Sequence, residues 1–140
     1  MSPTSTSGSL PLEPEVQERL DRLGLEFLAE FLGRASTRHP EQVETLAELA
    51  TILTRLGRLE EGLAADERLV RLAPEDPTVR YNLACSLALL GRKDSALDAL
   101  ERAFELGYRD AAHLGADTDL DALREEPRFR ALAARLAAPQ

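Results

Sequence analysis

The chain has 140 residues, enough for one domain of ordinary size or a short repeat array. It carries 17 basic and 25 acidic residues, a formal net charge of −8, so DNA or RNA gains no general attraction to it. Hydrophobic residues make up 44% and charged residues 30% of the chain, as in soluble globular proteins. No stretch approaches the ~20 apolar residues of a membrane span. A single cysteine favours a reducing, cytoplasmic compartment. We therefore expect neither nucleic acid nor a membrane as a partner.

Residues 1–14 are rich in serine, threonine and proline, and they lack the basic and apolar stretches of a signal peptide. Such a composition buries too little apolar surface to order the chain. We therefore predict a disordered tail over 1–14. The alternative is a peptide that docks into a groove of this chain or of a neighbour.

Residues 15–42 have apolar side chains at the spacing of a helix pair. The first run ends at Gly24 and the second ends before Pro40, two residue types that commonly terminate helices. The apolar positions are Val16, Leu20 and Leu23 in the first run and Leu28, Leu32 and Ala35 in the second. The pattern predicts a degenerate, repeat-like pair over 15–42, in which Phe27 and Phe31 cover the neighbouring unit.

An internal repeat follows, because residues 43–76 align with residues 77–110 at a period of 34. Both copies keep one glycine and apolar residues three and four positions apart. The identical pairs are Leu49/Leu83, Ala50/Ala84, Leu53/Leu87, Leu56/Leu90, Gly57/Gly91, Arg58/Arg92, Leu63/Leu97, Ala65/Ala99, Glu67/Glu101, Arg68/Arg102, Leu72/Leu106 and Asp76/Asp110. Since one unit cannot bury both of its apolar stripes alone, we expect the two units to stack.

Each unit predicts two helices joined by a tight turn. Gly57 and Gly91 follow the first apolar stripe of their unit, where a left-handed glycine ends a helix without a Cβ clash. The second helix of the first unit is predicted from about Leu59 to Leu72, and Pro74 prevents its continuation.

This pattern resembles the tetratricopeptide repeat, W-x2-L-G-x2-Y…A-x3-F…P at the same period. The matching residues are Leu46-x2-Leu49-Ala50-x2-Leu53, Gly62-x3-Asp66 and Pro74, then Arg80-x2-Leu83-Ala84-x2-Leu87 and Ala96-x3-Leu100. Asp66 and Arg80 stand where the family has large apolar residues. The resemblance implies an all-α fold, a short α-solenoid of antiparallel helix pairs.

Residues 111–140 resemble the end-of-group segment that closes many bacterial tetratricopeptide arrays. An array needs such a closure because its last apolar face would otherwise meet water. We predict a C-terminal helical cap over 111–140, with the covering residues Leu120, Leu123, Phe129, Leu132 and Leu136.

Tetratricopeptide arrays usually bind a peptide or a partner helix along a concave face, which the first helix of each unit lines. In this sequence that face would carry Glu44, Glu48, Thr51, Arg55, Thr78, Tyr81, Asn82, Cys85 and Leu89. Tyr81 and Asn82 would offer hydrogen bonds to the partner; the alternative is that both brace adjacent helices. The acidic chain favours a basic or amphipathic partner segment.

The candidate metal and catalytic sites fail on residue type or on number. The D-x-D-x-D run at 117–121 lacks the glycine and the final glutamate of a calcium loop, so we predict capping aspartates. His39 and His113 have no zinc-type spacing to Cys85, which we interpret as a structural or groove-lining cysteine. We expect no enzyme activity, no metal and no cofactor.

The sequence thus predicts a cytoplasmic, non-enzymatic adaptor that binds a protein partner through its concave face. The alternative is a self-associating structural subunit, such as a homodimer, in which Leu89, Phe27 or Phe31 packs against a second copy.

Overall fold

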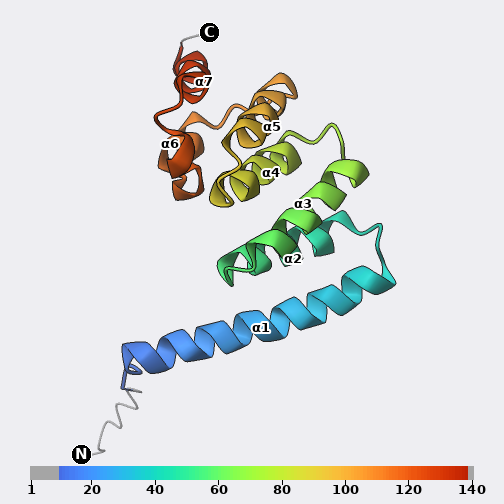
Figure 1. Cartoon of the computed structure of the whole chain (residues 1–140). Helices are drawn as coiled ribbons and strands as arrows, with labels where there is room; N and C mark the ends of the chain where they lie inside the picture. The colour runs from blue at the N-terminus through green and yellow to red at the C-terminus, as the bar shows by residue number, and fades with distance from the viewer. Residues whose placement is uncertain (1–9, 139–140) are drawn as a thin grey trace, which may run out of the picture.

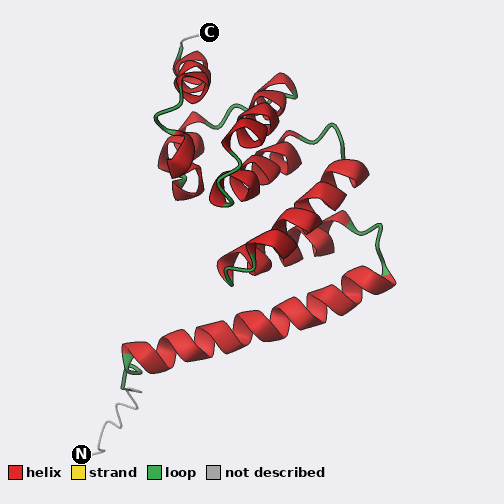
Figure 2. Cartoon of the chain, in the orientation of Figure 1, coloured by secondary structure: helices red, strands yellow, loops and turns green. Residues whose placement is uncertain are grey.

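The computed structural model describes residues 10–138, and over this range the chain consists of helices and the turns that join them (Figures 1 and 2). The α-helices are α1 (Pro14–Arg38), α2 (Val43–Arg55), α3 (Leu59–Leu72), α4 (Pro77–Leu89), α5 (Lys93–Glu105), α6 (Ala111–Ala116) and α7 (Pro127–Ala137), with a 3-10 helix η1 (Thr118–Leu123). Each helix from α1 to α5 packs against the next one in sequence, and η1 and α7 pack back on α4 and α5, which confirms an all-α solenoid of helix pairs. Most of the predicted tail, residues 1–9, lies outside the described residues.

The predicted N-terminal helix pair is wrong, because α1 is one helix of 25 residues, Pro14–Arg38. Gly24 does not end it. A glycine ends a helix where it takes a positive φ, and Gly24 has none. A Cβ at Gly24 would meet nothing within 4 Å, so no neighbouring element bends the chain there. Only the C-terminal part of α1 packs on α2, through Leu25, Ala29 and Leu32.

The two predicted glycine turns are confirmed. Gly57 has φ +76° and Gly91 has φ +75°. After each glycine the next amide donates back across the turn, from Arg58 to the Leu53 carbonyl at 2.9 Å and from Arg92 to the Leu87 carbonyl at 2.9 Å. This pattern satisfies carbonyl groups that the helix end would leave unpaired.

Small and capping residues stand where the helices approach each other, both within and between the helix pairs. A Cβ at Gly62 would lie 2.9 Å from Thr54 Oγ1, so α3 approaches α2 where glycine leaves room. Between the pairs, Asp76 caps α4 by accepting a hydrogen bond from the Thr78 amide at 2.8 Å. Pro77 occupies the first turn of α4, where its missing N–H costs nothing.

The C-terminal segment covers the last apolar face, as predicted. Leu120 and Leu123 are fully buried, Phe129 and Leu132 are nearly so, and Leu136 packs against the same core. On the outside, Arg128 of α7 reaches back to α5, where its guanidinium contacts Asp98 at 2.6 Å and Glu101 at 2.8 Å. The hydrogen bond from Arg128 lowers the pKa of Glu101.

Candidate functional site

A pocket of about 420 Å³ opens on the face that α2 and α4 form. Its polar and charged lining comes from both helix pairs and from the C-terminal segment: Thr51, Thr54 and Arg55 from α2, Asp66 from α3, Tyr81, Asn82 and Ser86 from α4, and His113, Asp117 and Asp119 from the α6–η1 segment. Because these elements are far apart in the sequence, stacking of the units creates the pocket.

The structure brings most of the predicted face residues together at this pocket. Those that line it are Thr51, Arg55, Tyr81, Asn82, Cys85 and Leu89. Glu44, Glu48 and Thr78 are exposed on the same helices but do not line the pocket. The predicted face is therefore larger than the hollow at its centre.

Tyr81 is a brace between elements. Its side chain is only 2% exposed, and its ring stacks on Tyr108 with the centroids 4.4 Å apart. Its hydroxyl donates a hydrogen bond of 2.8 Å to Asp117 Oδ2, and burial together with this bond raises the pKa of Tyr81. The expectation that the Tyr81 hydroxyl donates to a partner is wrong, because it already donates its hydrogen bond to Asp117. Asn82, in contrast, is exposed at the pocket.

Cys85 is also held inside the pocket wall. It is 8% exposed, and its Sγ lies 3.5 Å from Asp117 Oδ2. Burial raises the pKa of the thiol, and the charges of Asp117 and Asp119 raise it further. A thiol that stays protonated at neutral pH is a poor nucleophile, which agrees with a structural or groove-lining cysteine.

Asp66 is a buried carboxylate that sequence reasoning did not single out as functional. It is 3% exposed and accepts a hydrogen bond from the Ser86 hydroxyl, which joins α3 to α4. Burial raises the pKa of Asp66 from 3.8 to about 6, while the Ser86 hydrogen bond acts in the opposite direction. The sequence did carry one indication of this role, because the charged Asp66 stands at a position where the repeat pattern has an apolar residue.

The aspartates at 117 and 119 line the same pocket as Asp66. Asp117 caps η1 by accepting a hydrogen bond from the Asp119 amide at 3.0 Å, which confirms its predicted capping role. Its other oxygen lies 3.4 Å from His113 Nε2. Burial raises the pKa of Asp119, and the nearby charge of Asp117 adds to the effect.

Ligand atoms suited to a metal ion come closer in space than the sequence spacing indicated. One ligand atom each from Cys85, Asp117 and Asp119 lies within 4.8 Å of the others. The Asp117 carboxylate, however, already accepts hydrogen bonds from Tyr81, Cys85 and the Asp119 amide. These bonds account for the cluster as a closure of the C-terminal segment onto α4.

The repeat that supplies Tyr81, Asn82 and Cys85 to the pocket matches a known family. Residues 77–106, which span α4 and α5, match the family model described as Tetratricopeptide repeat. Residues 77–106 are therefore assigned to the tetratricopeptide repeat family. A tetratricopeptide repeat supports a general role in protein–protein interaction, and its all-helical fold is typical of proteins without enzyme activity.

A search of curated proteins finds no match to the chain. Within residues 10–138, none of its helices combines the length and the apolar character that crossing a membrane requires.

Proposed function

We propose that this protein is an adaptor that binds a segment of a partner protein at the pocket between α2 and α4, and that the segment inserts a basic side chain. The observation that carries the proposal is the charge of the lining. Asp66, Asp117 and Asp119 all line the pocket against a single arginine, Arg55, and none of the three pairs with an arginine or lysine of the described residues.

Two effects would stabilise a cationic side chain at this site. It would approach carboxylates that are partly removed from water, where charge–charge attraction is stronger than at an open surface. It would also offset the cost of the buried charge on Asp66, which has only the Ser86 hydroxyl as a hydrogen-bond partner in the described structure. Asn82 and Thr51 at the pocket supply neutral hydrogen-bonding groups that orient the segment.

The experiment is a selection of binding peptides from a random peptide library on the full chain, followed by affinity measurement. We expect the selected peptides to share a lysine or arginine, and their affinity to fall at least tenfold with Asp119→Asn. The matched control is Asp121→Asn, because Asp121 is exposed, lies two residues away and does not line the pocket.

A second matched pair tests the neutral part of the site. Thr51→Ala should weaken the same peptides, whereas Thr78→Ala, on an exposed threonine outside the pocket, should not. Two outcomes would contradict binding at the pocket. One is a set of selected peptides with no common basic residue, and the other is equal affinity for Asp119→Asn and for the native chain.

The alternative function, a self-associating subunit, is favoured by a different surface. Phe27 is 68% exposed and Phe31 is 61% exposed on α1, whereas Leu89 is half-buried in the pocket wall. Self-association would therefore use α1.

A further inference from the structure

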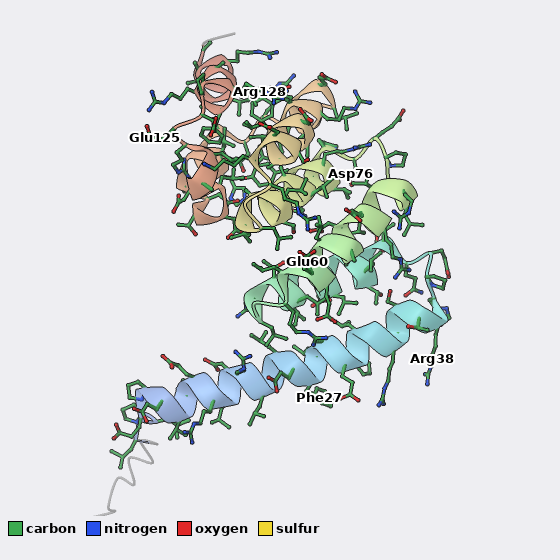
Figure 3. All side chains as sticks on the ribbon, viewed as in Figure 1. Phe27, Arg38, Glu60, Asp76, Glu125 and Arg128 are labelled. Carbon is green, nitrogen blue, oxygen red and sulfur yellow. The ribbon has the colours of Figure 1, made fainter. Side chains whose placement is uncertain are left out.

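Helix α1 has two apolar faces. The face that packs on α2 carries Leu25, Ala29 and Leu32. On the opposite side, at positions separated by three or four residues, lies an exposed stripe: Val16, Leu20, Leu23, Phe27 and Phe31, each between 43% and 68% exposed. At 100° per residue the centres of the two faces are about 180° apart. Figure 3 shows Phe27 on the side of α1 away from α2 and α3.

The stripe continues along a part of α1 that has no packing neighbour among residues 10–138. Helix α1 is about 37 Å long and α2 only about 20 Å, at 1.5 Å per residue, and the N-terminal part of α1 extends beyond α2 (Figure 1). This N-terminal part of α1 is short, and isolated helical segments of such length are only marginally stable in water. Within the stripe, the rings of Phe27 and Phe31 stack on each other, with their centroids 6.5 Å apart.

We propose that this stripe binds the same stripe of a second copy, with the two α1 helices antiparallel about a two-fold axis. In that register Leu20 faces Leu23 of the second copy, and Val16 faces Phe27. The large Phe27 thus meets the smaller Val16, and two leucines meet at the centre, as close packing requires. The interface is self-complementary, which is the condition for a closed dimer.

Charge complementarity favours the antiparallel orientation. Arg19 and Glu26 flank the stripe on the same edge, one heptad apart. In an antiparallel pair such edge positions face each other, so Arg19 of each copy lies opposite Glu26 of the other. A parallel pair places Arg19 opposite the Gly24 position and loses both ion pairs. An anionic lipid surface is disfavoured as the occupant, because the chain has a net charge of −8.

This dimer gives the self-associating alternative its surface and geometry, and it does not depend on the pocket. Light scattering of the full chain should give twice 15.4 kDa. Leu23→Glu should return the mass to 15.4 kDa, because it places a charge in the centre of the stripe. The matched control is Leu72→Glu, on an exposed leucine of α3, which should leave the dimer intact.

A second experiment exchanges charges between Arg19 and Glu26 and tests the antiparallel orientation of the two α1 helices. It does not rely on the loss of an apolar contact. Arg19→Glu and Glu26→Arg should each weaken the dimer, because each variant brings like charges together in its own homodimer. An equimolar mixture of the two variants should restore it, since both cross-pairs are then opposite in charge. Circular dichroism of each variant checks that α1 remains helical.

A native chain that stays at 15.4 kDa overturns the proposal, as does a dimer that survives Leu23→Glu. A dimer that weakens with both charge variants but is not restored by mixing overturns the antiparallel pairing. A monomeric chain that binds phosphatidylcholine–phosphatidylglycerol vesicles through the stripe assigns the surface to lipid. Asp119→Asn, which tests the pocket, should leave the mass unchanged, so the two proposals can fail separately.

Discussion

The Tyr81 hydroxyl donates a 2.8 Å hydrogen bond to Asp117 Oδ2, across 36 positions of the sequence. This bond joins α4 to the turn that precedes η1, so the C-terminal segment is held at the pocket by a polar contact as well as by its apolar core. The position of His113, Asp117 and Asp119 in the pocket therefore depends on Tyr81.

Tyr81→Phe removes that hydrogen bond and keeps the ring stacked on Tyr108. We expect a loss of about 1.5–3 kcal/mol in the free energy of unfolding, the range for a hydrogen bond to a charged group. Urea denaturation measures it. The control is Tyr108→Phe, because the Tyr108 hydroxyl is buried without a hydrogen-bond partner among the described residues. Equal losses for the two variants would argue against a bracing role for the Tyr81 bond.

Asp66→Asn should change how stability depends on pH. Burial raises the pKa of Asp66 from 3.8 to about 6, so between these values the folded chain keeps a proton that the unfolded chain has lost. Native stability therefore falls as the pH rises through this window, by about 3 kcal/mol at 1.36 kcal/mol per pKa unit. The variant lacks this loss.

Urea denaturation of both proteins from pH 4 to pH 8 gives the difference in unfolding free energy. The advantage of Asp66→Asn over the native chain should grow up to about pH 6 and then stay constant. Glu67→Gln, on an exposed carboxylate of the same helix, is the matched control. A difference that does not vary with pH would mean that Asp66 titrates alike in the folded and unfolded chain.

Leu120→Ala should be strongly destabilising, because Leu120 is fully buried beneath the C-terminal segment. The expected loss is about 2–5 kcal/mol, the range for a leucine truncated in a packed core. Leu72→Ala, at a leucine that is 41% exposed, should lose much less. Thermal unfolding compares the two. Similar losses would show that the segment does not close the core.

Glycine substitutions should have opposite signs at two kinds of position. Gly57→Ala forces alanine into a φ of +76°, and we expect a loss of about 1 kcal/mol. Gly33→Ala should stabilise the chain by about 0.5–1 kcal/mol, since Gly33 lies within α1 and a Cβ there meets nothing within 4 Å. A destabilising Gly33→Ala would indicate that this side of α1 contacts another surface.

The repeated helices were predictable because local rules and packing agree there. Gly57 and Gly91 stand one period apart at the end of equivalent apolar stripes, and α3 has the predicted limits Leu59–Leu72. Gly24 misled the prediction of the first segment, since a glycine alone does not end a helix whose apolar spacing continues on both sides. The turn needs a positive φ and a neighbouring helix to pack back on.

The site was only partly predictable, for a related reason. Counting helical offsets placed Thr51, Arg55 and Asn82 on the correct face, because that face follows from one helix at a time. The role of Tyr81 depends on Asp117, and the burial of Asp66 depends on Ser86; both contacts cross between elements. Sequence spacing carries no direct signal of such contacts.

The hydrogen-bonded pair of Asp66 and Ser86 also affects the partial unfolding of the array, because it lies between α3 and α4. Most of the buried apolar residues of α4, α5 and the C-terminal segment form one cluster, whereas those of α2 and α3 form others. In a stacked array, stability is a sum of unit terms and interface terms, and a buried carboxylate weakens the interface that contains it. We expect hydrogen exchange to reveal a sub-global open state in which α1–α3 unfold while α4–α7 stay protected. A partner that neutralises Asp66 would suppress this state and make the whole chain unfold as one cooperative unit.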